Sequence, residues 1–338
     1  MNKFHGLALA LLVACPAKTT PYPGDTGGLL FEGDDRIFHM ASEDAPVRVL
    51  QTFGGGGRSG LSWDAQGERF AFASNHEGKW RVFIGDLGGK QARAGEFKED
   101  FILQVEWAPV GEWIALQSQG STVGTGGLVI VHALSGVRRQ LTPRGRHDGD
   151  FAWMPDGKRI AVSATLESKV LEHSDVIWVQ RTSAITLVDV STGQRENLVE
   201  LDTEAYAPSV SPAGDRLLYV ADKALWSLRT EPGARPERLA TSVANHVRPS
   251  FSPDGHRIFA VARESKESGA DDVPFVLDLE GQRTDFPQHA LVSKVVWSPD
   301  GSQLALTDSY GLFLLKLDGT ELELPVEDYE YQSGLDWH

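Results

Sequence analysis

One five-residue frame recurs along this chain: an aromatic or aliphatic residue followed by a short turn that ends in glycine. The clearest copy is Trp297–Gly301, which reads Trp-Ser-Pro-Asp-Gly. Six copies share the frame, and they begin at Trp63, Trp107, Trp153, Val210, Phe251 and Trp297. Proline presets φ, aspartate tolerates the next corner and glycine takes a positive φ, so each copy predicts a hairpin turn. Such a repeat constrains nearly the whole chain, because each unit can bury its faces only against its neighbours.

A short apolar strand is predicted after each of these glycines. Segments such as Phe70–Phe72, Ile114–Leu116 and Leu304–Leu306 are rich in branched and aromatic residues, which indicates buried strands rather than helices. A third strand follows in each unit, as at Ile185–Val188, and a weaker fourth follows, as at Arg138–Leu141. Four antiparallel strands in a repeat of about 40 to 45 residues are typical of a β-propeller blade.

The two ends of the chain are predicted to complete each other. Trp337 stands where a seventh anchor belongs, 40 residues after Trp297. Three apolar segments near the N-terminus, 29–31, 36–40 and 47–50, look like the second, third and fourth strands of a blade without its first. We expect Leu335–Trp337 to supply that first strand, because this pairing removes open sheet edges. The predicted fold class is therefore all-β: one propeller over residues 28–338 with seven four-stranded blades, six being the alternative.

The first residues look like an export signal. Lys3 gives a positive start, Leu7–Ala14 is apolar, and Cys15 follows small residues. The apolar run is too short to span a bilayer. The segment resembles the lipobox of bacterial lipoproteins, in which the cysteine thiol is diacylated and the preceding peptide, here residues 1–14, is removed. An ordinary secretory signal is the alternative; the lipoprotein interpretation is favoured because Cys15 is the only cysteine of the chain.

The lipoprotein resemblance implies where the protein would reside. Several acyl chains anchor a protein stably without a spanning segment. Residues 15–27, rich in proline and glycine, would then be a tether between the lipid and the ring. Pro16 follows the cysteine, so the aspartate that retains lipoproteins in the inner membrane of enteric bacteria is absent. The resemblance thus implies export to the outer membrane of a Gram-negative cell. It leaves open whether the protein faces the periplasm or the cell surface.

The charge of the chain excludes one class of partner. The formal net charge is −15, and an acidic surface repels nucleic acid and anionic lipid head groups. Contact with the membrane is therefore expected through the lipid anchor alone. No linker or shift in composition divides the repeats, so we expect a single ring domain. The protein is also expected to be a monomer.

The complete turns at Ser252–Gly255 and Ser298–Gly301, with a partial one at Pro155–Gly157, resemble the repeat of TolB-type propellers. The same repeat occurs in the propellers of the prolyl oligopeptidase class. TolB carries an α/β domain before its ring and contacts a peptidoglycan-associated lipoprotein. We expect that domain to be absent here, so the Tol role is not carried over. The peptidases use an appended hydrolase domain, and no Gly-x-Ser-x-Gly elbow occurs in this sequence. The resemblance implies the fold and leaves the function open.

One unit is longer than the others. The interval from Trp153 to Val210 is 57 residues against 40 to 46 elsewhere, and the excess falls around Thr165–Arg181. Loops between second and third strands emerge on the same face of a propeller as the connections between blades. We therefore expect this insertion, taken as a loop, to lie near the connection at 147–150. The candidate ligands for a divalent cation such as calcium are His147, Asp148, Asp150, His173 and Asp175. An ordinary solvated loop is the alternative.

Charged residues are also expected around the channel of the ring. The starts of the innermost strands contribute Glu106, Arg248 and Lys294, together with Asp150, near the channel mouth. A second long charged loop is expected at Arg263–Asp272, flanking the same face. Tyr329 and Tyr331 on the last connection between blades either anchor a partner or cover the seam of the ring.

No Walker loop, His-Glu-x-x-His motif or cysteine pair is present, so no catalytic residue is assigned. The leading hypothesis is a lipid-anchored envelope propeller that is a non-catalytic scaffold for another envelope protein. The alternatives are a metal-dependent propeller hydrolase of the lactonase or phytase type, and a glycan- or peptidoglycan-binding sensor. No cofactor is expected, apart from a divalent cation if the enzyme alternative holds.

Overall fold

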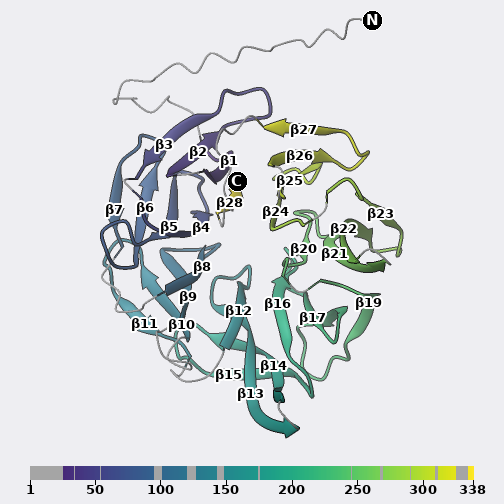
Figure 1. Cartoon of the computed structure of the whole chain (residues 1–338). Coiled ribbons are helices and arrows are strands. Elements are labelled where there is room, and N and C mark those ends of the chain that lie inside the picture. Colours follow the sequence, from purple (N-terminus) through teal and green to yellow (C-terminus); the bar gives the residue numbers. More distant parts are fainter. Residues whose placement is uncertain are drawn as a thin grey trace, which may run out of the picture.

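The computed structural model shows a ring of sheets around a central axis (Figure 1). It describes residues 26–33, 35–53, 55–94, 101–119, 127–142, 148–173, 176–244, 246–266, 269–289, 291–308, 311–324 and 334–338. The described residues form seven four-stranded antiparallel sheets and no helix. The predicted all-β propeller of seven blades is confirmed. In the described part of the chain no helix is long and apolar enough to cross a membrane.

The blades are numbered from the N-terminus, and their strands are given from the axis outwards. Blade 1 holds β28 (Leu335–Trp337), β1 (Leu29–Gly33), β2 (Arg36–Met40) and β3 (Arg48–Thr52). Blade 2 holds β4 (Arg58–Trp63), β5 (Arg69–Ser74), β6 (Arg81–Asp86) and β7 (Gln91–Arg93). Blade 3 holds β8 (Phe101–Trp107), β9 (Trp113–Gln119), β10 (Gly127–His132) and β11 (Arg138–Gln140).

The remaining blades keep the same order. Blade 4 holds β12 (Asp148–Trp153), β13 (Arg159–His173), β14 (Val176–Asp189) and β15 (Arg195–Leu201). Blade 5 holds β16 (Ala205–Val210), β17 (Arg216–Ala221), β18 (Ala224–Arg229) and β19 (Glu237–Thr241). Blade 6 holds β20 (Ser250–Phe251), β21 (Arg257–Lys266), β22 (Gly269–Asp278) and β23 (Arg283–Asp285). Blade 7 holds β24 (Lys294–Trp297), β25 (Gln303–Thr307), β26 (Leu312–Lys316) and β27 (Glu321–Leu324).

The ring closes through its C-terminal strand. β28 pairs with β1, Leu29 opposite Trp337 and Phe31 opposite Leu335. Asp336 then reaches the next blade, where one carboxylate oxygen accepts the backbone N–H of Trp63 at 2.7 Å. The predicted closure is therefore confirmed: the last residues complete the first blade and also join it to the second.

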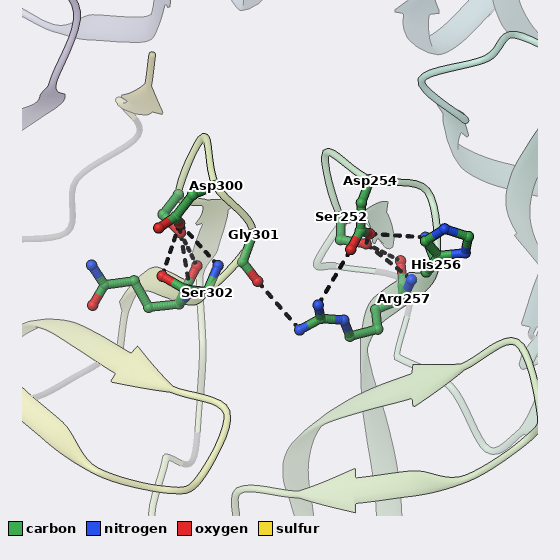
Figure 2. A network of polar contacts seen from close by, with 9 residues as sticks. Ser252, Asp254, His256, Arg257, Asp300, Gly301 and Ser302 are labelled. Carbon is green, nitrogen blue, oxygen red and sulfur yellow. Dashed lines mark hydrogen bonds and ion pairs between the residues drawn. The ribbon is translucent and has the colours of Figure 1, made fainter.

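The repeated turn is a small hydrogen-bond network (Figure 2). In blade 6 the Ser252 hydroxyl donates to Asp254 at 2.5 Å and accepts the backbone N–H of Arg257 at 2.9 Å. Gly255 has φ +74°, a conformation that glycine adopts without strain. These bonds hold the carboxylate ionised, with the Ser252 bond the largest influence lowering the pKa of Asp254. Arg257 also donates to the carbonyl of Gly301 at 3.3 Å, which joins this turn to that of blade 7.

The hydrophobic core lies between neighbouring blades rather than in one central mass. Leu30 and Ile37 of blade 1 pack with Trp63, Phe70 and Phe72 of blade 2 in one cluster of buried residues. Equivalent clusters join the other neighbours around the ring. Each blade therefore depends on the two beside it, which explains why an open ring would leave two apolar faces in water.

The two regions expected as loops are strands. β13 pairs with β14 from Arg159 opposite Asp189 to His173 opposite Val176, with one irregularity after Thr165. Likewise β21 and β22 pair continuously as far as Lys266 opposite Gly269. The expectation of loops was wrong because continued pairing satisfies the backbone groups of both insertions. The insertion of blade 4 also carries strand-forming residues such as Val170, Ile177 and Val179, whereas that of blade 6 is mostly polar. The result is two elongated hairpins, and the one in blade 4 reaches beyond the rest of the ring (Figure 1).

Candidate functional site

A cavity of about 830 Å³ runs along the axis and is lined by the inner strands of all seven blades. Side chains alternate along a strand, so the lining residues stand one and three positions before each anchor residue. The charged residues one position before the anchor are Glu106 and Asp336; those three positions before are Asp150, Arg248 and Lys294. The four residues expected at the channel mouth therefore all line this cavity.

An ion pair crosses the cavity from blade 6 to blade 3. Arg248 Nη1 donates to Glu106 Oε1 at 2.5 Å. The same oxygen accepts a hydrogen bond from the Gln104 amide at 2.6 Å, and that amide also donates to the carbonyl of Phe151 at 3.0 Å. This network ties three blades together through the axis of the ring.

Two further charged groups of the cavity have shifted pKa values. Asp336 is partly exposed to the cavity but surrounded by protein, and burial raises its pKa to about 6. The backbone N–H groups of Trp63 and Trp337, at 2.7 and 3.0 Å, act in the opposite direction. The pKa of Lys294 is lowered, first by burial and then by the charge of Arg248. The cavity thus holds charges of both signs close together.

Asp150 has a structural contact of its own. One of its carboxylate oxygens accepts the backbone N–H of Ala207 in blade 5 at 2.8 Å. Ala207 has φ +52°, which is unfavourable for a residue with a side chain. The hydrogen bond therefore helps to hold strained backbone inside β16, at the irregularity between Tyr206 and Ser209.

The structure describes only part of the predicted metal-binding set. His147 and Asp175 lie outside the described residues; for Asp148 and His173 only the backbone strand is described. Asp148 pairs with Ala164, and His173 lies nine residues further along β13, roughly 30 Å along an extended strand. The strand therefore does not bring these two residues together. Within the described residues, no group of three or more His, Cys, Asp or Glu side chains is arranged to hold a metal ion.

The long hairpin of blade 4 is fixed at its base by a polar cluster. Arg181 on β14 donates to one oxygen of Glu204 at 2.5 Å, and Tyr206 donates to the other at 2.5 Å. Glu204 lies on the connection from blade 4 to blade 5. Burial, followed by the hydrogen bond to Glu204, raises the pKa of Tyr206 to about 12. The hairpin is thereby bound to the connection between blades 4 and 5 and to the start of β16.

A corresponding cluster fixes the long hairpin of blade 6. Arg263 on β21 makes two hydrogen bonds to Asp272 on β22, at 2.8 and 3.0 Å. His246, on the connection from blade 5 to blade 6, lies 3.2 Å from the same carboxylate and lines the cavity. The Asp272 side chain is only 2 % exposed, so both partners are needed to compensate its burial. The bond to Asp272 is also the largest influence raising the pKa of Arg263.

These two clusters were not found from the sequence, because the arginine of the first lies 23 positions from Glu204 and the histidine of the second lies 26 positions from Asp272, on different strands and connections. Asp336 was missed as well. Its signal was available: in the units of Trp63, Trp107 and Trp337 the residue before the anchor is polar, namely Ser62, Glu106 and Asp336. Cys15, Tyr329 and Tyr331 lie outside the described residues, so their predicted roles stay predictions.

Solved structures share this fold. TolB from Acinetobacter baumannii matches with a TM-score of 0.55 and 14 % identity over 78 % of this chain and 64 % of that one, so the chain spans less than two thirds of it. An oligogalacturonate lyase in complex with manganese matches with a TM-score of 0.66 and 14 % identity over 90 % of this chain and 86 % of that one. A chain of a nidogen/laminin complex matches with a TM-score of 0.53 and 12 % identity, over 77 % of this chain and 92 % of that one.

Neither the protein-family models nor the curated protein sequences contain a match to this chain. At 12 to 14 % identity the structural likeness establishes the fold alone. The predicted resemblance to TolB-type propellers is confirmed at that level.

Proposed function

We propose that this chain is a lipid-anchored envelope propeller that binds another protein without catalysing a reaction. Propellers with this fold include TolB and a chain of a nidogen/laminin complex, which is an assembly of proteins. The binding surface we assign is the face that carries the channel mouth and the two long hairpins. It holds charged, aromatic and aliphatic groups side by side, a mixture that suits a protein partner.

The observation that carries this proposal is that both hairpins are fixed at their bases. β13 is 15 residues long and β21 is 10, while β17 of the intervening blade 5 has only 6. At about 3.4 Å per residue the two hairpins exceed blade 5 by roughly 30 and 14 Å. A hairpin held by ion pairs loses little conformational freedom on binding, so more of the contact energy is available for affinity.

Exposed apolar side chains lie beside the same mouth. Phe101 and Leu103, at the start of β8, are 52 % and 51 % exposed, and Leu103 lines the cavity. Large apolar groups on a rigid surface, next to charged ones, favour recognition of a protein surface over simple solvation.

The anchor is the second part of the proposal. Diacylation at Cys15, with residues 15–27 as tether, would hold the ring within about 40 Å of the membrane. Cys15→Ser tests this part. We expect the variant to remain unacylated and to leave the membrane fraction or to keep its signal. Normal acylation and fractionation of Cys15→Ser would reject the lipid anchor.

The partner-binding face is tested by crosslinking in cells and purification of the tagged mature protein. The informative variant replaces residues 166–182 by Asn-Gly, which joins Thr165 to Ser183 where they already pair. The control replaces Asp222-Lys223, the turn of blade 5, by Asn-Gly without changing its length. We expect one stoichiometric partner with the parent and the control, and its loss with the trimmed hairpin. Equal capture by all three proteins would place the interface elsewhere.

A further inference from the structure

Two cations of neighbouring blades share the wall of the central cavity. Arg248 precedes β20 in blade 6, Lys294 begins β24 in blade 7, and both line the cavity. The charge of Arg248 lowers the pKa of Lys294. An influence of this kind requires the two cationic groups to be near each other. They are therefore placed to act on one bound anion.

Arg248 has hydrogen-bonding capacity to spare. A guanidinium group carries five N–H donors in a planar fork. Arg248 uses one terminal nitrogen for Glu106, and in the described part of the chain its guanidinium has no second partner. The side chain is 30 % exposed, so these donors are accessible from the cavity. Glu106 in turn occupies the position at which an external carboxylate would bind.

The charges are ordered along the axis of the ring. Arg248 and Lys294 stand three positions before their anchor residues, while Glu106 and Asp336 stand one position before theirs. Two positions along a strand correspond to about 7 Å. The inner strands start on the face of the long hairpins, because the connections between blades lie there. A guest that enters from this face therefore meets Arg248 and Lys294, with the carboxylate of Asp150 at the same level, before it meets Glu106 and Asp336.

We propose that the central cavity binds a small polycarboxylate anion. One carboxylate of this anion replaces Glu106 as the partner of Arg248 and lies beside Lys294. Arginine binds carboxylates through two parallel N–H···O bonds, which suits the free side of this guanidinium. The cavity volume, about 830 Å³, falls in the range of small-molecule sites. Glu106 acts as an internal competitor that keeps Arg248 paired when no guest is present. This inference does not depend on the proposed protein partner.

Tricarballylate, a flexible tricarboxylate, is the probe, and glycerol is its uncharged three-carbon control. Both are titrated into the mature protein by calorimetry at constant ionic strength. We expect saturable binding of tricarballylate and none of glycerol. Arg248→Gln and Lys294→Gln should each weaken binding at least about tenfold, the effect of losing one charged hydrogen bond. Lys158→Gln removes an exposed cation from the opposite face, beside the turn of blade 4, and should leave binding unchanged.

The variant Glu106→Gln distinguishes two roles of the Glu106–Arg248 ion pair: competition with a bound guest, and a purely structural contact. If Glu106 competes with the guest, its neutral variant should bind tricarballylate several-fold more tightly than the parent, while circular dichroism confirms the fold. A purely structural pair predicts no gain. Absence of saturable binding in both the parent and Glu106→Gln would overturn the proposal. Equal losses of tricarballylate affinity in Arg248→Gln and Lys158→Gln would also overturn it. So would a protein that is captured in cells only when Arg248 is present, if tricarballylate itself does not bind.

Discussion

The three-residue strand that closes blade 1 and the fifteen-residue strand of blade 4 differ in what they contribute. β28 completes a sheet, buries Leu335 and joins the first two blades through Asp336. β13 is buried from Ile160 to Ala164, and its remaining residues extend a hairpin beyond the ring. Strand length is therefore a poor guide to importance. The closing strand has few residues but no substitute, whereas the extension of β13 adds surface to a blade that is already complete.

Blade 5 shows how little a blade requires. Its second and third strands have six residues each and are joined by Asp222 and Lys223, which have φ values of +49° and +56°. Backbone of this conformation forms the tight turns favoured in hairpins. Since blade 5 packs into the ring as the others do, residues beyond this length in blades 4 and 6 are available for other purposes.

The largest effect is expected from removing Leu335–His338. The deletion exposes one edge of β1 and a face of the apolar cluster that Leu335 joins. We expect the free energy of unfolding to fall by at least about 3 kcal/mol, measured by chemical denaturation. An unchanged midpoint would show that the ring does not rely on this strand and would remove the contrast with β13.

Asp336→Asn is expected to have the next largest effect, and its sign depends on pH. Burial raises the folded-state pKa of Asp336 to about 6 from its ordinary value of 3.8. The folded protein therefore binds this proton more tightly, and the contribution of the group to stability declines as the pH rises from about 4 to about 6. Asparagine keeps an oxygen for the N–H of Trp63 but carries no charge.

Above pH 6 we thus expect Asp336→Asn to be more stable than the parent, by up to about 2 kcal/mol. The difference should shrink as the pH falls toward 4. Denaturation curves across this range provide the measurement. A difference that does not vary with pH would mean that burial does not control the titration of this carboxylate.

Trimming the hairpin of blade 4, with residues 166–182 replaced by Asn-Gly, should change the free energy of unfolding by less than about 1 kcal/mol. The buried part of β13 is kept, and a shorter connection costs less closure entropy. Thermal and chemical unfolding of the trimmed protein should resemble those of the parent. A decrease in the free energy of unfolding as large as that from deleting Leu335–His338 would instead show that the extended hairpin is needed for the stability of the ring.

Glu204→Gln should have the smallest effect on stability, below about 1 kcal/mol, because Glu204 and Arg181 are both about one third exposed. Its consequence should be local. Without the charge of Glu204, Tyr206 should titrate below its parent value of about 12, as read from tyrosinate absorbance. The amides at the base of the hairpin should also exchange faster. An unaltered titration of Tyr206 would show that Glu204 does not fix the hairpin.

Much of the fold could be predicted from the sequence because the repeated turn has a local cause. Ser252, Asp254 and Gly255 form their network within a few residues, so the frame is visible without tertiary information. The closure was predictable because Trp337 repeats the spacing of the other anchors. The extended hairpins were not, since polar residues such as Ser168 and Lys169 do not reveal whether an insertion pairs with itself.

The candidate site was predictable only in part. Glu106, Arg248 and Lys294 could be placed in the channel from their distance to the next anchor residue, because side chains alternate along a strand and this rule is local. Which of them would pair was not visible, since Glu106 and Arg248 are 142 positions apart and meet across the axis. The clusters around Glu204 and Asp272 likewise depend on how a hairpin packs against a connection between blades.

The pairing of β28 with β1 also sets an order of events during synthesis. The ribosome makes the N-terminal strands first, so one edge of β1 stays unpaired until Leu335 and the rest of β28 have been made. The first blade is thus the last to be completed. A chain truncated anywhere upstream of β28 retains that open edge, a state that proteases and chaperones recognise, so closure of the ring requires synthesis as far as this strand.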